Sequence, residues 1–277
     1  MRARRHRRLL PDRHGGRGVR PVAEAHDLAL AAGAHARAAG RLLASEKDQV
    51  AAVHLARRHI KRARSLLRAL RPLARPAVER ENGFLRAFAH TLAPLRDAHA
   101  LEEAARSVGA RGHGSARGDR VDLAALGQAL QKQARVIGRL APKDAPRHYL
   151  AKAVARAYGK ARRAFRAYEL EPGEEPLHEA RKRIKDCLHL VEALDEVRPR
   201  GARPKAGKLD RLGELMGAIR DLDLLARRLD GSEGGRAKRA RIQARHTRLE
   251  REVARTGEKT FAAKPAAVEK SWRKAGP

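Results

Sequence analysis

Apolar side chains recur every three or four positions along most of this 277-residue chain, and clusters of glycine and proline interrupt the recurrence. Such spacing places apolar side chains on one face of an α-helix. Ser45 and Asp48 have the spacing of a helix-capping pair, and Asp119 ends a glycine-rich loop, so both places predict a helix start. The pattern predicts an all-α chain with helices at 21–44, 46–70 after the Ser45 cap, 78–108 with a kink at Pro94, 119–140, 146–170, 177–197, 208–230, 236–257 and 261–272.

The segment 54–70 is strongly two-sided when it is read as a helix. Ala56, Ile60, Ala63, Leu66, Leu67 and Leu70 share one side, and His54, Arg57, Arg58, Lys61, Ser65 and Arg68 share the other. We therefore expect a buried apolar face and a cationic stripe on the same helix.

A similar segment occurs later in the chain, at 178–194. His54 matches His178, and 178 − 54 = 124 residues. A second block obeys the same offset, because Pro94-Leu95-Arg96-Asp97 aligns with Ala218-Ile219-Arg220-Asp221 and 221 − 97 = 124. Two blocks with one offset indicate an internal duplication of a unit of about four helices. The predicted organisation is a basic disordered arm at 1–21, a first repeat at 22–145 and a second repeat with the C-terminal tail at 146–277.

The chain carries a formal net charge of +31 at pH 7, which predicts a polyanionic partner. Aromatic residues make up only 3%, so we expect an aliphatic, alanine-rich core. Two further helices place basic residues on one face, with Lys152 and Arg156 in the first and Arg241 and Arg245 in the second. Nucleic acid, anionic lipid, polyphosphate and an acidic protein are all candidate partners at this point.

The pattern H-x-x-R-x-x-x-K, followed one helix later by L-x-x-[LI]-R-D, resembles the CHAD domain, the conserved histidine α-helical domain. Both blocks occur twice, with Met216 in place of the first leucine in the second copy. The resemblance covers about 22–272. It implies two helical bundles related by a pseudo-two-fold axis, a basic central cleft and binding of inorganic polyphosphate. It also suggests a cytoplasmic protein that associates with polyphosphate granules.

The motif transfers His54, Arg57, Lys61, Arg62 and Arg64 from the first copy and His178, Arg181 and Lys185 from the second. The second copy departs from the family pattern, because Asp186, Leu188 and His189 stand where further basic residues and an aromatic are usual. Together with the stripes, the predicted polyphosphate ligands are His54, Arg57, Arg58, Lys61, Arg62, Arg64, Lys152, Arg156, His178, Arg181, Lys182, Lys185, Arg241 and Arg245.

Two other functions compete with polyphosphate binding. Non-specific nucleic-acid binding also suits a basic protein, but no helix-turn-helix, zinc or RNP-type pattern occurs, and few aromatics are available for stacking. A polyphosphate-metabolising enzyme or its accessory subunit is the third candidate, although the chain lacks an E-x-E-x-K signature and a carboxylate cluster for Mg²⁺. We therefore predict binding without catalysis.

The histidines of the two motifs and the single cysteine do not indicate a metal site or a catalytic site. His54 and His178 lack a His, Cys or Glu partner at i+4, so neither predicts a metal site, and no cofactor is expected. Cys187 matches Ala63 on the apolar face and is expected to be a core thiol. No apolar run of about 18 residues predicts a membrane span, and nothing in the pattern indicates an oligomeric state.

Overall fold

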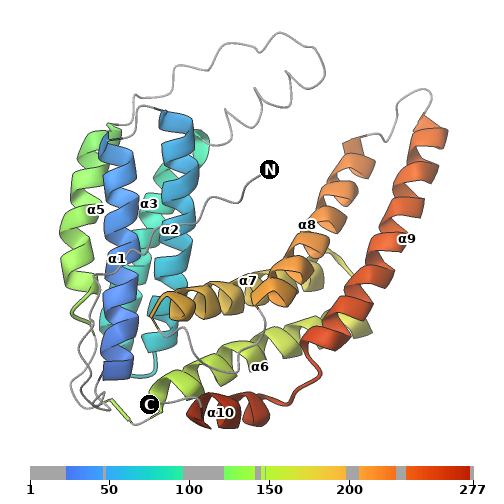
Figure 1. Cartoon of the computed structure of the whole chain (residues 1–277). Helices are drawn as coiled ribbons and strands as arrows, with labels where there is room; N and C mark the ends of the chain where they lie inside the picture. Colours follow the sequence, from blue (N-terminus) through green and yellow to red (C-terminus); the bar gives the residue numbers. More distant parts are fainter. Residues whose placement is uncertain are drawn as a thin grey trace. The chain divides into compact units, whose positions relative to one another are not determined.

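The computed structural model describes residues 23–45, 48–95, 122–140, 145–146, 148–197, 206–228 and 235–274. In these ranges every regular element is a helix, which confirms the all-α prediction (Figure 1). The predicted arm at 1–21, together with Arg96, Asp97 and Asp119, lies outside the described residues. The helices are α1 (Ala23–Ser45), α2 (Gln49–Leu70), α3 (Arg75–Thr91), α5 (Leu123–Ile137), α6 (Tyr149–Leu170), α7 (Glu174–Val197), α8 (Ala206–Arg228), α9 (Gly235–Thr260) and α10 (Pro265–Lys274).

The chain divides into two compact units, Met1–Tyr149 and Leu150–Pro277. In the first unit α1 packs against both α2 and α5. The crossing of α1 and α5 requires glycine, because a Cβ atom at Gly40 would lie 2.6 Å from the main-chain oxygen of Gly127. A Cβ atom at Gly127 would lie equally close to the oxygen of Gly40. Glycine at position 40 therefore allows α1 and α5 to approach closely, although glycine is unfavourable in a helix interior.

Asp48 alone caps the start of α2. Its side chain accepts hydrogen bonds from the main-chain nitrogens of Val50 at 3.0 Å and Ala51 at 3.1 Å. Ser45 is the last residue of α1, and its hydroxyl donates to the main-chain oxygen of Arg41 at 2.7 Å. The predicted pairing of Ser45 with Asp48 as a capping box was therefore wrong, because a longer α1 takes Ser45 for its own C-terminal turn.

Two other helix starts differ from the sequence prediction. Pro76 lies in the first turn of α3, where its missing N–H costs nothing, so the helix begins at Arg75 and not near Val78. Asp122 caps α5 by accepting a hydrogen bond from the nitrogen of Ala125 at 2.9 Å. The sequence prediction placed this helix start at Asp119, which lies outside the described residues.

In the second unit α8 packs against α7 and α9. Aromatic side chains join α6 to the end of α9, since the Tyr158 hydroxyl lies 3.1 Å from the main-chain oxygens of both Thr260 and Ala263. Gly257 of α9 lies directly against the ring of Phe165, because a Cβ atom there would be 1.9 Å from Cζ. These contacts hold the C-terminal end of α9 on α6.

The apolar faces predicted for the two similar segments are buried. On α2 the buried set includes Ala56, Ile60, Ala63, Leu66, Leu67 and Leu70, each fully covered. On α7 it includes Ala180, Ile184, Cys187 and Val191, also fully covered. Burial, with a smaller effect from the neighbouring Asp186 charge, raises the pKa of the Cys187 thiol to about 12. The prediction of a core thiol at this position is confirmed.

No helix in the described part of the chain combines the length and the apolar character that a bilayer span requires.

Candidate anion-binding site

The polar face of α2 is strongly cationic. The helix contains six Arg or Lys residues and no Asp or Glu. His54, Arg58 and Lys61 are exposed, whereas Arg57, Arg62 and Arg64 are half-buried. The structure therefore brings the six predicted ligands of this unit together on one helix.

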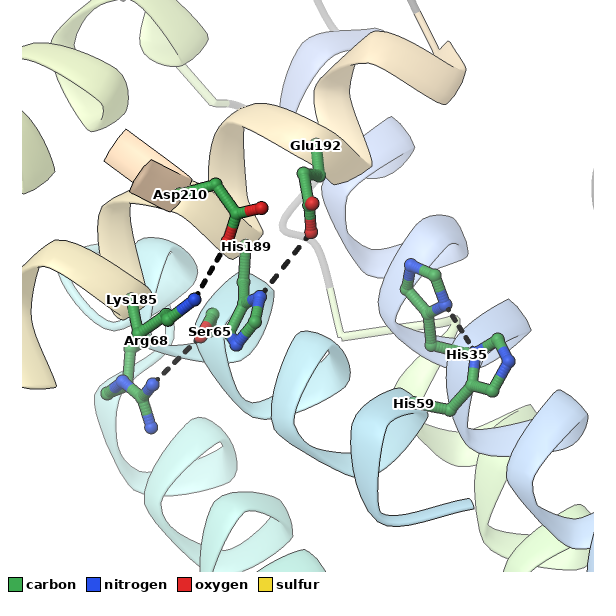
Figure 2. A network of polar contacts seen from close by, with 8 residues as sticks. All are labelled: His35, His59, Ser65, Arg68, Lys185, His189, Glu192 and Asp210. Carbon is green, nitrogen blue, oxygen red and sulfur yellow. Dashed lines mark hydrogen bonds and ion pairs between the residues drawn. The ribbon is translucent and has the colours of Figure 1, made fainter. Parts of the chain in front are cut away.

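Several guanidinium groups on α2 are held in place by uncharged acceptors. Arg57 donates to the main-chain oxygen of Ala89 on α3, and Arg64 Nε donates to the side-chain oxygen of Asn82 at 3.0 Å. One turn later the Arg68 guanidinium donates to the Ser65 hydroxyl at 2.9 Å (Figure 2). These hydrogen bonds orient the three guanidinium groups.

The helix that carries the second copy of the motif has the opposite charge balance. α7 contains four Arg or Lys residues against seven Asp or Glu residues, a formal charge of 4 − 7 = −3. Its Glu179 carboxylate lies 3.0 Å from Lys182 Nζ and 2.6 Å from Arg183 Nε. Lys185 Nζ lies 2.8 Å from Asp210 Oδ1 of α8 (Figure 2). Two of the predicted ligands on α7, Lys182 and Lys185, therefore already have carboxylate partners.

Two glycines of α8 give room for the basic side chains of α7. A Cβ atom at Gly217 would lie 3.2 Å from Arg181 Nε and 3.3 Å from Nη2. A Cβ atom at Gly213 would lie 2.7 Å from Lys185 Cε. Because the glycines are one turn apart, as are the two basic residues, each side chain of α7 extends across one glycine of α8. Larger residues at these positions would displace the two cations.

A pocket of about 390 Å³ lies between the start of α7 and the later turns of α8. It brings the predicted ligands His178 and Arg181 together with residues that sequence reasoning did not single out as ligands. The lining residues are Glu174, Glu175, Leu177, His178, Arg181, Arg220, Asp223, Leu224 and Arg227. Arg220 and Arg227 are seven residues apart on α8, a helical spacing that gives a signal in the sequence, but their proximity to α7 depends on the tertiary fold.

An ion pair at the exposed rim of this pocket joins its two helices. Arg227 Nη2 lies 2.6 Å from Glu174 Oε2. The hydrogen bond from Arg227 lowers the pKa of the Glu174 carboxyl, and weaker effects of Arg220 and His178 act in the same direction. Arg181 also lines the pocket, and its Nε atom is buried and has no hydrogen-bond partner in the described residues.

The remaining predicted ligands of the second unit lie on other helices. Lys152 and Arg156 are exposed on α6, and Arg241 and Arg245 are exposed on α9. Arg245 borders a surface depression of about 520 Å³ with Arg248 and Glu252. The pocket at the start of α7 includes none of these four predicted ligands.

Within the described ranges, no three His, Cys, Asp or Glu side chains are placed so that they could hold one metal ion together.

The comparison with known protein families agrees with the motif. A family model of the CHAD domain matches residues 27–230, which is well over half of the chain. No curated protein and no solved structure matches the chain. The match includes both histidine motifs and most of the described helices, and so the chain belongs to the CHAD domain family.

Proposed function

We propose that this chain binds inorganic polyphosphate without turning it over, chiefly through the cationic face of α2. The polar face of that helix presents side chains that favour phosphate. Arg and Lys form charge-assisted hydrogen bonds with phosphate oxygens, and Arg offers a planar set of donors that matches them. The CHAD family match supports a polyphosphate-related role.

The observation that carries this proposal is the one-signed charge of α2, with six cations and no carboxylate over Gln49–Leu70. Solvated helices of ordinary proteins usually interleave acidic and basic residues at i,i+4, where opposite charges stabilise each other. Six like charges on one helix repel one another unless carboxylates elsewhere in the chain, an anionic ligand or counterions compensate them. A linear polyanion supplies that compensation along the length of the helix.

The two motif copies differ in charge, and this difference favours unequal contributions to polyphosphate affinity. At the offset of 124 residues, Arg62, Arg64 and Arg68 correspond to Asp186, Leu188 and Glu192. Three cations are thus replaced by two anions and one apolar side chain, a difference of 3 − (−2) = 5 charges. The structure also gives Lys182 and Lys185 carboxylate partners. We infer that α2 contributes more to the affinity for long chains than α7 does.

Three finer elements belong to the same proposal: an internal duplication, a basic cleft shared by the two halves, and association with polyphosphate granules. The duplication is supported by the two motif blocks at one offset. It is also supported by equal burial of matching positions, such as Ile60 and Ile184 at 0% exposure. The pseudo-two-fold axis, the shared cleft and the granule association stay predictions from the family resemblance.

Binding without catalysis is supported by the ion pairs that the carboxylates near the cations form. Glu174, Glu179 and Asp210 each form an ion pair with a basic side chain. A two-metal phosphoryl-transfer site needs carboxylates gathered around the ions instead. We therefore expect no phosphate release from polyphosphate when Mg²⁺ is added, and measured release would favour the enzyme alternative.

The proposal is tested by titrating the purified chain with long-chain polyphosphate and with duplex DNA of equal total charge over a series of salt concentrations. Counterion release weakens both complexes as salt rises, so the comparison must be made at each concentration. We expect tighter binding of polyphosphate at physiological salt. Equal or tighter binding of DNA would overturn the assignment and favour a non-specific nucleic-acid-binding protein.

A further inference from the structure

The pocket between α7 and α8 has the dimensions of a small-ligand site. Its volume of about 390 Å³ lies near the lower end of the roughly 300–1,000 Å³ typical of such sites. Its lining also mixes charges, with three arginines and three carboxylates, unlike the uniformly cationic polar face of α2. The two surfaces therefore suit different parts of an anionic ligand.

Arg181 gives the clearest indication that the pocket has a ligand. Its Nε atom is buried and makes no hydrogen bond in the described part of the chain. The guanidinium group is confined on one side by Gly217, which lies against Nε and Nη2. Buried donors in native structures almost always have partners, so an unpartnered one on a side chain that lines a pocket favours an acceptor bound in that pocket. A phosphate oxygen is such an acceptor.

Two of the three carboxylates in the lining are already engaged. Glu174 pairs with Arg227 at 2.6 Å, and Asp223 Oδ1 lies 3.0 Å from His246 Nε2 of α9. Arg220, by contrast, is exposed and has no hydrogen-bond or ion-pair partner among the described residues. The donors left for a ligand are therefore those of Arg181 and Arg220, together with the exposed imidazole of His178.

The same carboxylates disfavour the interior of a long chain. A polyphosphate strand that crossed the pocket would bring successive phosphates close to Glu175 and to the paired carboxylates of Glu174 and Asp223, and like charges at short range repel. A chain end has to enter from one side only. A terminal phosphate group also carries roughly 1.5 to 2 negative charges near pH 7, as a phosphomonoester does, which strengthens its bonds to arginine.

We propose that this pocket binds a terminal phosphate group, as found at the end of a linear polyphosphate chain or in free orthophosphate. The inference rests on the proposed polyphosphate function and adds to it a second, end-selective site. The guanidinium groups of Arg181 and Arg220 donate to the terminal oxygens, and His178 donates from the start of α7. The pocket thus binds chain ends, whereas the polar face of α2 is proposed to bind chain interiors.

Ligands with and without chain ends test this site on the full-length protein. Linear tripolyphosphate has two terminal phosphates, whereas cyclic trimetaphosphate has none. Isothermal titration calorimetry measures both ligands against the unmodified protein, Arg181→Lys and the matched control Arg57→Lys at the equivalent position of α2 (57 + 124 = 181). Arg181→Lys keeps the positive charge but removes Nε, so a loss of affinity reports the hydrogen bonds and not the charge alone.

We expect Arg181→Lys to weaken tripolyphosphate binding about tenfold, the effect of one hydrogen bond to a charged group, and to leave trimetaphosphate binding unchanged. Arg57→Lys should not discriminate between the two ligands. An equal effect of Arg181→Lys on both ligands, or no effect on either, would overturn the inference. Arg220→Gln, which alters an exposed side chain, gives an independent second variant if Arg181→Lys lowers the melting temperature.

Two further measurements are needed. One distinguishes free orthophosphate from a chain end as the ligand, and the other shows whether the proposed function or the proposed pocket is wrong. If orthophosphate displaces tripolyphosphate at comparable concentration, a single phosphate group is the ligand; if it does not, the pocket recognises the linked end of a chain. Both results support a terminal phosphate site. Long-chain polyphosphate and duplex DNA are titrated against the same preparations. If DNA binds as tightly as polyphosphate, the proposed function is refuted. The comparison of tripolyphosphate with trimetaphosphate still tests the terminal phosphate site on its own.

Discussion

Replacing Gly217 by alanine should stabilise α8 and at the same time move the Arg181 guanidinium, so the two effects can be measured separately. Gly217 lies in the interior of α8, and alanine in a helix interior is more favourable than glycine by about 0.5–1 kcal/mol. The added Cβ atom would lie 3.2 Å from Arg181 Nε and 3.3 Å from Nη2. Both atoms are at the far end of a flexible side chain, so the guanidinium moves and the helix backbone stays in place.

The size of the effect follows from these contacts. A hydrogen bond to a charged group contributes about 1.5–3 kcal/mol, which corresponds to roughly 10–150-fold in affinity if it is lost. A guanidinium displaced by a few tenths of an ångström keeps part of that bond. We therefore expect Gly217→Ala to weaken tripolyphosphate binding about 3–10-fold while the free energy of unfolding rises by up to about 1 kcal/mol.

Gly83→Ala is the matched control, because Gly83 lies in the interior of α3 and a Cβ atom there would have no other atom within 4 Å. It should stabilise the protein similarly and leave binding unchanged. Urea denaturation measures stability, and calorimetry measures binding. Unchanged tripolyphosphate binding in Gly217→Ala would refute the role given to the Arg181 position. A loss of stability in that variant would show that packing of α7 on α8 resists the methyl group.

Two further predictions concern the core of the second unit. Gly257→Ala should lower the free energy of unfolding by at least roughly 1–3 kcal/mol, the cost of an overpacked core, because the added Cβ atom would lie 1.9 Å from Phe165 Cζ. Urea denaturation at neutral pH measures this change, and a value below about 0.5 kcal/mol would contradict the prediction. Burial raises the pKa of Cys187 to about 12 and, with the Glu250 and Asp223 charges, that of Tyr168 to about 12. Because both folded-state values lie above the ordinary 9.0 and 10.0, their stabilising effect is complete below about pH 9 and is lost as pH rises towards 12. Stability measured from pH 8 to 11 should therefore fall less steeply in Cys187→Ala than in the unmodified protein, and identical slopes would exclude a contribution from the thiol.

The helices and their buried faces could be predicted from local pattern because each depends on periodicity within one segment. The apolar face of α2 and the buried position of Cys187 are examples. Helix starts were less predictable, since Ser45 has a side chain that suits a cap but is used in the last turn of α1. Which of several polar residues near a boundary caps a helix depends on where the preceding helix ends, and local sequence does not settle that.

The features that build the pocket depend on contacts between helices. Nothing in the sequence around Gly213 or Gly217 indicates that basic side chains of α7 extend across them. The pair of Glu174 and Arg227 joins residues 227 − 174 = 53 positions apart. The acidic residues of α7 were visible in the sequence, but only the structure shows that Lys182 and Lys185 are paired with carboxylates.

The central claim, that the cationic face of α2 binds polyphosphate, is tested most directly by two equivalent double variants. Arg58→Gln with Lys61→Gln alters α2, and Lys182→Gln with Lys185→Gln alters the positions 124 residues later on α7. We predict that the α2 variant weakens long-chain polyphosphate binding at physiological salt about 5–30-fold, from two cation–phosphate contacts of roughly 0.5–1 kcal/mol each. The α7 variant should change it less than about threefold, because α7 has a formal charge of −3 and its lysines lie against Glu179 and Asp210. Equal losses in the two variants, or a larger loss in the α7 variant, would contradict the account.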